Sequence, residues 1–430
     1  MRHSARAYSV RHGRLPVRTA RGPLARLVAA ALAVVAVSAG AVTAYAVGDT
    51  MASFKPSIHL VSASGRSVAQ PPSVGAESGA VNILLAGTDT RSGQGGQFAT
   101  SDELAGSSGA GNNDVTMVLH LSADHTHATV ISIPRDMMVR VPSCPTPNGP
   151  TSAQASAQFN TTLSTGGLSC VVLTAEALTG LTIPYAAEIT FDGVIAMSNA
   201  IGGVTVCLAT PITDPYVGLD LPGGQQTLVG QQALEFVRSR HGVGDGSDLG
   251  RISDQQLFLA ALLRKATGAG TLGNPLTLYS LAKAATSNIQ LSDTLASPTT
   301  LVSIALALKN VPLSDFVFLQ YPAMTDPDDP NRVVPDPTGV SALTHALSAD
   351  VPVTLTGTTG AATEAVAGPG AASPAPSAAA TPSAAATAAP SNATGSTAAT
   401  ASPTPTPTTV SLPSNVTGQT AAQQTCTKGG

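Results

Sequence analysis

The chain has 430 residues, and its 21 Lys and Arg against 25 Asp and Glu give a formal net charge of −4. Seven of the arginines lie within the first 26 residues, and no Asp or Glu precedes Asp49. The rest of the chain therefore holds 14 basic and 25 acidic residues, which excludes a nucleic-acid-binding protein that works through a basic face. Aromatic residues make up only 3% and Trp is absent, so we expect part of the chain to lie outside any packed core.

An uncharged stretch rich in Ala, Val and Leu follows the N-terminal arginines at 27–48. As a helix it is about 33 Å long, enough to cross a hydrocarbon core. The positive-inside rule places the basic segment 1–26 in the cytoplasm, so the prediction is a single-pass protein of the cell membrane with its remaining residues outside the cell. The alternative is a cleaved signal peptide, because Ala44-Tyr45-Ala46 resembles a cleavage site. Either topology makes 49–78 an extracellular linker.

The C-terminal part of the chain has a low-complexity composition. The segment 356–413 is dominated by Ala, Thr, Ser, Pro and Gly, and Glu364 is the only charged residue between Asp350 and Lys428. Such a segment has too few large apolar side chains to offset the entropy of ordering it. We therefore predict a disordered extracellular stalk at 356–413, followed by a C-terminal tail at 414–430.

The four cysteines contain no C-x-x-C pair, which argues against a zinc site. In an exported protein an even number of cysteines indicates disulfides. Cys144 and Cys170 flank a loop rich in Gly, Ser and Thr and form the predicted pair. A bond between Cys207 and Cys426 is the remaining alternative, and it would tie the distal tail to the core.

The segment 79–355 is long enough for one large domain with a substantial core. Its apolar runs predict strands, joined by helical segments. The predicted strands are 81–87, 115–122 and 128–134, with a hairpin connection at 122–127, and the predicted helices are 169–180, 192–201, 251–266 and 275–288. This alternation predicts an α/β fold, a layered α-β-α domain with a central mixed sheet, accompanied by one N-terminal transmembrane helix and the disordered C-terminal tail.

Arginine replaces lysine throughout the middle of the chain. No Lys lies between Lys55 and Lys265, whereas the arginines of that span include Arg91, Arg135, Arg140, Arg238, Arg240 and Arg251. A high genomic GC content also favours arginine, but the planar guanidinium is the better bidentate ligand for phosphate. Arg91 and Arg135 directly follow predicted strands, where ligands gather on α/β sheets.

The sequence Arg238-Ser239-Arg240 adds a geometric reason. If the chain extends just after a helix at 231–237, residues two apart point to the same side. A Gly-rich loop at 242–246 follows, and then Ser247 or Asp248 is expected to cap the helix that carries Arg251 in its first turn. Two phosphates would fit at this point. The alternative is a structural network in which these arginines pair with Asp248 and Asp254.

Asp89 and Asp114 are the metal-binding candidates, because each lies beside a predicted strand near the arginines. Carboxylates at such a place bind Mg²⁺ (or Mn²⁺) that bridges to phosphate oxygens. The alternative is that each is an ordinary turn former at a strand end.

Two further groups of polar residues receive structural interpretations. The acidic cluster at 326–336 contains prolines typical of a solvated turn, and His120, His125 and His127 are predicted to be surface residues on or beside the hairpin. Several enzyme classes are excluded, because the chain has no P-loop, no G-x-S-x-G elbow and no H-E-x-x-H motif.

An ordered set of motifs resembles the LytR-CpsA-Psr family. The set comprises Gly-Thr-Asp-Thr-Arg at 87–91, Asp114 at the start of a strand, Ser-Ile-Pro-Arg-Asp at 132–136, Ile-Gly-Gly-Val-Thr-Val at 201–206, Gly-Gln-Gln-Ala-Leu at 230–234, and the block from Arg238 through Arg251 to Gln256. The resemblance covers about 80–270, and the last block is its most specific part.

The resemblance implies a membrane-anchored phosphotransferase. Such enzymes move a glycopolymer from a polyprenyl-pyrophosphate carrier onto peptidoglycan during cell wall assembly and form a phosphodiester. Asp89 and Asp114 would hold Mg²⁺, and Arg135, Arg238 and Arg240 would be catalytic. The pyrophosphate would be bound by Arg91, Arg135, Arg238, Arg240, Arg251 and Gln255. The resemblance also implies an apolar groove for the lipid tail.

The chain departs from the family pattern at two places. Asn112-Asn113 stands where a basic residue often precedes the second Asp, with Val115 in place of Thr, and Asp254 stands where a basic or amide residue commonly follows Arg251 by three. The predicted site is therefore less positive than in many relatives. The alternative functions are a polyprenyl-pyrophosphate hydrolase and a non-catalytic envelope receptor or scaffold that binds lipid-linked polymer.

Overall fold

The computed structural model describes residues 38, 41, 44–62, 79–92, 94, 101, 104, 111–366 and 409–430. The chain divides into two units, 1–52 and 53–430. In the first unit residues 44–52 are helical. The predicted cytoplasmic segment 1–26 and most of the predicted anchor 27–48 lie outside the described residues. Within the described ranges no helix has the length and apolar character that a membrane crossing requires.

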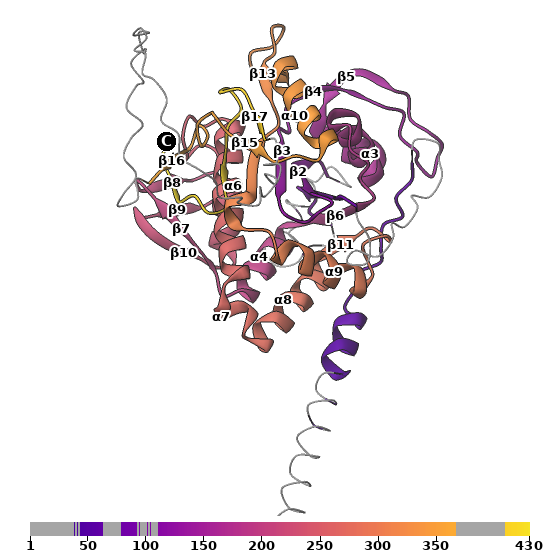
Figure 1. The fold of residues 1–430 in the computed structure, drawn as a ribbon, viewed down its shortest axis with the longest axis vertical. Coiled ribbons are helices and arrows are strands. Elements are labelled where there is room, and N and C mark those ends of the chain that lie inside the picture. Colours follow the sequence, from indigo (N-terminus) through magenta and orange to yellow (C-terminus); the bar gives the residue numbers. More distant parts are fainter. Residues whose placement is uncertain are drawn as a thin grey trace, which may run out of the picture. The chain divides into compact units, whose positions relative to one another are not determined.

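A seven-stranded mixed sheet forms the centre of the second unit (Figure 1). Its strands run in the order β11-β6-β1-β2-β3-β12-β18. The pairs β1–β6 and β3–β12 are parallel and the other four pairs are antiparallel. The strands are β1 (Val81–Thr88), β2 (Asn113–Leu121), β3 (Ala128–Ile133), β6 (Tyr185–Ile189), β11 (Ile289–Leu291), β12 (Phe316–Gln320) and β18 (Gly418–Thr420).

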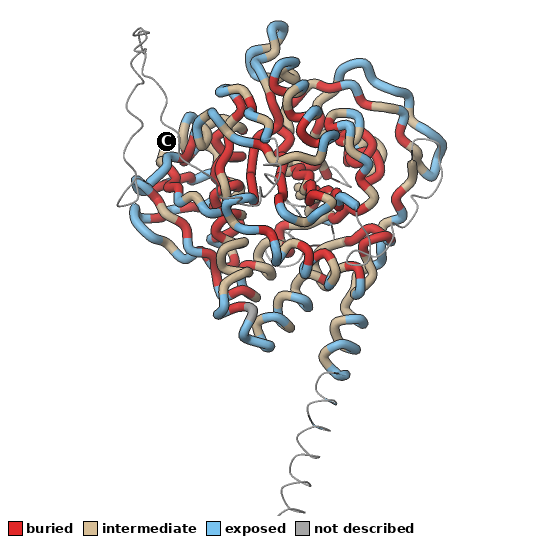
Figure 2. The backbone as a smooth tube through the Cα atoms, viewed as in Figure 1, coloured by how far each residue is buried: buried red, intermediate tan, exposed pale blue. Residues whose placement is uncertain are grey.

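Both faces of this sheet are covered, because alternate side chains of its strands point to opposite sides. Leu84, Val118 and Ile131 pack on one face with α3 (Thr162–Thr179) and α10 (Pro337–Ala349). On the other face, Met117 and Val130 pack with α6 (Asp248–Thr267) and α9 (Pro298–Lys309). The central strands β3 and β12 are buried along their whole length (Figure 2). The predicted layered α/β domain with a central mixed sheet is confirmed.

A second, four-stranded sheet has the order β10-β7-β19-β16. It is built from β7 (Val204–Leu208), β10 (Gly224–Leu228), β16 (Thr363–Ala365) and β19 (Thr425–Thr427). Its buried residues share a core with α5 (Gln231–Arg238) and with α6. Helix α6 therefore contributes to the cores of both sheets.

Shorter elements connect these layers. The strands are β4 (Met138–Val141), β5 (Gln154–Gln158), β8 (Ile212–Asp214), β9 (Leu219–Leu221), β13 (Ala323–Thr325), β14 (Val333–Pro335), β15 (Val353–Thr354) and β17 (Val410–Ser411). The helices are η2 (Phe159–Thr161), α4 (Phe191–Ala200), α7 (Ala269–Leu272), α8 (Pro275–Asn288) and η3 (Leu313–Asp315).

The predicted helices and strands are all present. Helix α8 has the predicted bounds 275–288, and the other elements have shifted boundaries. Helix α3 begins at Thr162, before the predicted start at 169, because it continues across a kink at Gly166 and Gly167. Helix α6 begins at Asp248, because the Ser247 side chain caps it by accepting a hydrogen bond from the Gly250 N–H. Asp248, the other residue that the sequence offers as a cap, is the first residue of α6.

The C-terminal prediction needs correction. Residues 409–430 were expected to lie in the stalk and tail, but they return to the domain, where β18 pairs with β12 and β19 pairs with β7 and β16. Leu412, Val416 and Ala421 are buried there. A few apolar residues suffice because the backbone of each strand is hydrogen-bonded to an existing sheet edge. Residues 356–366 also belong to the folded unit, whereas 367–408 lie outside the described residues.

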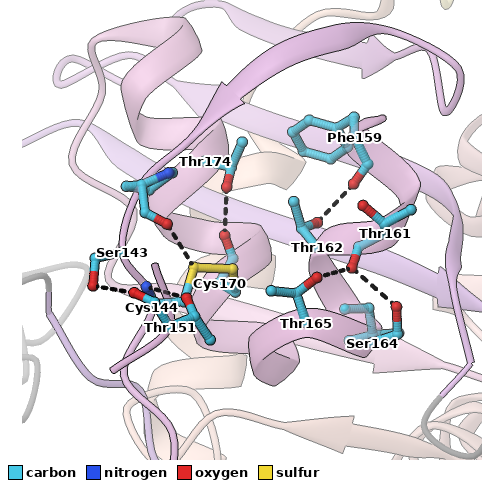
Figure 3. The surroundings of a disulfide bond; sticks show 12 residues. Ser143, Cys144, Thr151, Phe159, Thr161, Thr162, Ser164, Thr165, Cys170 and Thr174 are labelled. Carbon is cyan, nitrogen blue, oxygen red and sulfur yellow. Dashed lines mark hydrogen bonds between the residues drawn. A yellow bond between two sulfur atoms is a disulfide. The ribbon is translucent and has the colours of Figure 1, made fainter. Parts of the chain in front are cut away.

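Two disulfides are present. Cys144–Cys170 joins the loop before β5 to α3, and Figure 3 shows the surrounding hydroxyl groups, with Thr151 accepting from the Cys144 N–H and Thr174 donating to the Cys170 carbonyl. Cys207–Cys426 joins β7 to β19. Both disulfides considered from the sequence are therefore present: the predicted Cys144–Cys170 bond, and the Cys207–Cys426 bond that ties the end of the chain to the core.

The histidine prediction is wrong for two of three residues. His120 and His127 are 2% and 5% exposed. His120 is buried because its ring lies between Asn82 Oδ1, at 2.8 Å, and Asp350 Oδ1, at 3.1 Å. Burial lowers the pKa of His120, although Asp350 opposes that shift. The acidic cluster at 326–336 is a β13–β14 hairpin turn, with Asp336 capping α10.

Candidate functional site

A cavity of about 430 Å³ opens where the ends of β1, β3 and β6 meet α4, α5 and α6. Six residues predicted to bind metal or pyrophosphate line it together: Asp114, Arg135, Arg238, Arg240, Arg251 and Gln255. Asp89 and Arg91 do not line the cavity itself, but they lie beside it, as described below. The fold therefore gathers residues that lie up to 166 positions apart between Asp89 and Gln255.

A β-bulge places Asp114 at the cavity. Along the β1–β2 pair, Gly87 lies opposite Val115 and Thr88 lies opposite Asn113, so Asp114 has no partner in the ladder. Bulges leave one residue unpaired and redirect its side chain. The Asp114 backbone carbonyl is thereby available to Arg251, whose Nη2 donates to it at 2.9 Å.

Asp89 follows β1 and is tied to the loop before β2. Its Oδ1 accepts from the Asn112 N–H at 2.6 Å, in a turn where Gly111 has a φ of +79°. A side chain at Gly111 would lie within 2.8 Å of Asp89 Oδ1, so this close approach requires glycine. Burial raises the pKa of Asp89, the Asn112 N–H lowers it, and the neighbouring Asp114 carboxylate raises it further. The two predicted metal ligands are thus electrostatic neighbours.

Arg135 follows β3 and lies among three carboxylates. Its Nη1 donates to Asp114 Oδ1 at 2.9 Å, and its Nε lies 3.4 Å from Asp136 Oδ2 and 3.7 Å from Asp248 Oδ1. Burial alone lowers the pKa of Arg135, but these carboxylates outweigh burial and the net pKa is raised. Arg135 therefore stays charged in a half-buried position.

Arg251 lies in the first turn of α6, as predicted, and is held by Asp248. Its Nη2 is 2.5 Å from Asp248 Oδ1, and the side chains of both residues are less than a tenth exposed. Burial lowers the pKa of Arg251, an effect that Asp248 opposes. Of the arginines in the alternative structural network, Arg251 does pair with Asp248, which also contacts Arg135. The ion pairs of the described residues include none made by Asp254.

Arg238 and Arg240 reach the cavity from the end of α5. Helix α5 ends at Arg238, and Ser239 is extended, with φ −58° and ψ 136°. The predicted geometry, a helix followed at once by extended chain, is therefore present, and both arginines line the cavity. Arg238 stacks on the Phe191 ring with its Cζ 4.3 Å from the centroid, and Arg91 Cζ lies 5.0 Å from the same centroid.

Arg240 and Gln255 differ in how they are held. The Nε of Arg240 is buried and has no hydrogen-bond partner among the described residues. Gln255 donates from Nε2 to the Val237 carbonyl at 2.9 Å. Gln255 therefore fixes the last turn of α5, and the arginines that follow it, through the main chain.

Most of the other residues that line the cavity are apolar. They include Leu85, Met117, Ile189, Val194, Met197, Leu234, Phe258, Leu259, Leu262 and Ile289. Guanidinium groups and many apolar side chains in one cavity fit an amphipathic ligand with an anionic head and an apolar chain.

Asn113 and Asp254, two of the residues that depart from the family pattern, do not line this cavity. Asn113 is fully buried, where its amide contacts Thr116 Oγ1 at 2.9 Å and the Leu163 N–H at 3.1 Å. Asp254 faces away toward Thr427, whose hydroxyl donates to it at 2.8 Å. Burial raises the pKa of Asp254 well above its ordinary value. The expectation that these two residues make the site less positive is not supported by their positions. Val115 does line the cavity.

Two residues of the site have no clear signal in the sequence. Phe191 is one of few aromatic residues and begins α4 directly after β6, a position that marks it only once that strand is known to border the cavity. Asp214 ends the short strand β8 and accepts hydrogen bonds from the Arg238–Gly242 turn. Its role depends on contacts such as the hydrogen bond from Ser239, which lies 25 residues further along the chain.

The chain matches the model of the LytR_cpsA_psr family over residues 37–337. It is 33% identical over 267 residues to cell wall biosynthesis protein LcpA of Corynebacterium glutamicum, covering 57% of this chain and 51% of that protein. It is 30% identical over 196 residues to polyisoprenyl-teichoic acid–peptidoglycan teichoic acid transferase TagU of Oceanobacillus iheyensis, covering 46% and 54%. The chain thus spans about half the length of the curated relatives it matches.

Two solved structures share the fold. Protein gbs0355 of Streptococcus agalactiae has a TM-score of 0.52 at 23% identity, and the match covers 63% of this chain and 87% of that protein's chain. A LytR-Csp2A-Psr enzyme from Actinomyces oris has a TM-score of 0.50 at 20% identity, and the match covers 68% of this chain and 96% of that enzyme's chain. The mixed sheet and the motifs gathered at its edge agree with the match over 37–337, and the chain belongs to the LytR-CpsA-Psr family.

Proposed function

We propose that this protein transfers a glycopolymer from a polyprenyl-pyrophosphate carrier to peptidoglycan during cell wall assembly. The observation that carries this proposal is one cavity lined both by four arginines and by many apolar side chains. A lipid pyrophosphate combines the same two characters, an anionic head and an apolar chain. The transferase name of the TagU relative is in keeping with this substrate class.

The reaction is a phosphoryl transfer. A hydroxyl oxygen of the peptidoglycan acceptor forms a bond to the phosphorus that carries the sugar, while the bridging P–O bond of the pyrophosphate breaks. Polyprenyl phosphate leaves, the acceptor proton is released, and the product is a phosphodiester. Charge accumulates on the transferred and leaving oxygens, which Arg135, Arg238 and Arg240 stabilise from fixed positions. Arg91, Arg251 and Gln255 bind or position the pyrophosphate around them.

Asp89 and Asp114 would hold Mg²⁺ (or Mn²⁺). Their mutual repulsion, which raises the pKa of Asp89 in addition to the effect of burial, is the feature that a divalent cation relieves. Among the described residues no group of three or more His, Cys, Asp or Glu side chains is placed to hold a metal. Pyrophosphate oxygens and water would therefore complete the shell, as is usual for Mg²⁺. When bound, the cation would neutralise charge on those oxygens.

The proposed location is the cell membrane. The uncharged stretch 27–48 would anchor the chain, with 1–26 in the cytoplasm and the catalytic domain outside the cell. This topology places the cavity on the side of the membrane where peptidoglycan lies.

The test uses the full-length protein in detergent with a polyprenyl-pyrophosphate oligosaccharide, peptidoglycan fragments and Mg²⁺. We expect a covalent phosphodiester product that depends on Mg²⁺ and falls by about 100-fold or more in Arg135→Ala and Asp89→Ala. Arg140→Ala is the matched control, because Arg140 is exposed on β4 and does not line the cavity.

The outcomes separate the competing functions. Sugar phosphate and lipid phosphate without product on peptidoglycan would identify a hydrolase. Lipid binding without turnover would leave a receptor or scaffold. Unchanged turnover in both Arg135→Ala and Asp89→Ala would overturn the site assignment.

A further inference from the structure

Asp214 lies directly behind the arginine turn, outside the cavity. It is the last residue of β8 and is 1% exposed. Its Oδ2 accepts four hydrogen bonds, from Ser239 Oγ at 2.7 Å and from the N–H groups of Arg240, His241 and Gly242 at 3.0, 3.1 and 3.2 Å. Its Oδ1 accepts from the Tyr216 N–H at 3.1 Å.

Three consecutive N–H groups converging on one oxygen form an anion-binding nest. The ion pairs of the described residues include none made by Asp214, so its negative charge is stabilised by main-chain and hydroxyl donors. These hydrogen bonds lower the pKa of Asp214 in spite of its burial, which acts in the opposite direction. The turn at 239–242 and the Asp214 carboxylate therefore depend on each other.

The turn decides where the guanidinium groups of Arg238 and Arg240 lie. Ser239 is fully buried and breaks α5, which sends Arg238 and Arg240 to the same cavity. Arg135 and Arg251 are held by carboxylates that contact their side chains. For Arg240 the ion pairs of the described residues include none, so the position of its main chain matters more.

We propose that Asp214 is a positioning residue for pyrophosphate binding, which holds the main chain of residues 239–242 so that Arg238 and Arg240 converge on one anionic group. This proposal rests on the proposed function for the identity of the anion. It assigns no contact with substrate to Asp214, which acts only through the two arginines.

The variants are Asp214→Asn and Asp214→Ala, with Asp220→Asn as the matched control. Asp220 lies on β9 in the same hairpin, is exposed, and accepts from Thr213 Oγ1 at 3.1 Å. The asparagine variant keeps the shape of the side chain but turns an NH₂ group or a neutral oxygen toward the donors. Should the alanine variant fail to fold, Ser239→Ala removes a single hydrogen bond of the same network.

The first readout is binding of farnesyl pyrophosphate by calorimetry, compared with farnesol. We expect Asp214→Asn to weaken binding of farnesyl pyrophosphate about 10-fold and Asp214→Ala about 100-fold, since small misplacements of positioning groups have effects of this size. Farnesol binding of Asp214→Asn should stay close to that of the wild type, as should all properties of Asp220→Asn.

A double-variant cycle separates positioning from general stabilisation. If Asp214 acts through Arg240, adding Asp214→Asn to Arg240→Ala should weaken farnesyl pyrophosphate binding by much less than it does in the wild type. Additive losses, or wild-type affinity in Asp214→Asn, would overturn the proposal. Wild-type protein that binds farnesyl pyrophosphate but transfers nothing to peptidoglycan would refute the proposed function and leave the role of Asp214 to be decided by the cycle. Wild-type protein that does not bind the probe would refute both.

Discussion

The arginines of the cavity are held in two different ways. Arg135 and Arg251 contact carboxylates with their side chains, chiefly Asp114 and Asp248. Arg238 and Arg240 are placed by their main chain, through the helix end, the Ser239 break and the Asp214 carboxylate. The positive charges of Arg135 and Arg251 are thus partly neutralised by the carboxylates that hold them. The Asp214 carboxylate behind Arg238 and Arg240 instead accepts hydrogen bonds from main-chain N–H groups.

In the proposed function this difference would divide the work of binding one anion. A phosphate that approaches Arg135 would compete with the acidic neighbours of its guanidinium group. At Arg238 and Arg240 the Asp214 carboxylate contacts the main chain of the turn, and both side chains line the cavity. The following predictions test this contrast.

The largest effect is expected from Asp248→Asn, because it removes the ion-pair partner of Arg251 and leaves a buried guanidinium poorly compensated. Breaking such a pair costs about 3–5 kcal/mol of unfolding free energy. Denaturant titration of this variant and of Asp245→Asn, a nearby exposed carboxylate that accepts the Ser247 N–H, measures the difference. Equal stabilities would show that Arg251 does not depend on Asp248.

A smaller effect, on activity rather than stability, is expected from Arg240→Lys. Lysine keeps the charge but loses the planar pair of donors, so kcat/KM for the lipid donor should fall about 10- to 100-fold. The unfolding free energy should change little, since Arg240 makes no ion pair with the described residues. A large loss of stability would mean that the two pairs of arginines are held alike.

The smallest effect is expected from Phe191→Leu. The ring lies under both Arg91 and Arg238, and cation–π contacts contribute about 0.5–2 kcal/mol. Donor affinity should fall by about 3- to 10-fold, and Phe191→Tyr should restore it. Val194→Ala, on the next turn of α4, is the control for a loss of apolar surface at the same cavity. If its effect equals that of Phe191→Leu, the ring acts only by its size.

The sequence was most informative where local patterns decide the structure. Buried runs located β1, β2 and β3, and residues directly after or before these strands lie at the same sheet edge because β1 and β2 are antiparallel neighbours. The geometry of Arg238 and Arg240 also followed from a helix end and two-residue spacing. These inferences need only the backbone periods of helix and strand.

The sequence does not reveal contacts between segments that are far apart along the chain. Asp254 looked like a departure in the site, but it packs against Thr427, 173 residues away. Phe191 and Asp214 act only through neighbours from other elements. The sequence predicts His120 at the surface, because it does not reveal the contact with Asp350, which is 230 positions away. Composition suggested a disordered tail and gave no sign that backbone pairing would order its end.

The return of the last strand has a consequence for how quickly the domain forms. Strand β19 pairs with β7, and the disulfide that joins them closes a separation of 219 residues. Contacts of such long range slow folding, because closure entropy must be met before the pairing gives any stabilisation. That entropy grows only with the logarithm of length, so doubling a connecting loop costs about 0.6 kcal/mol. The long separation between β7 and β19 therefore affects the rate of folding more than the stability of the folded domain.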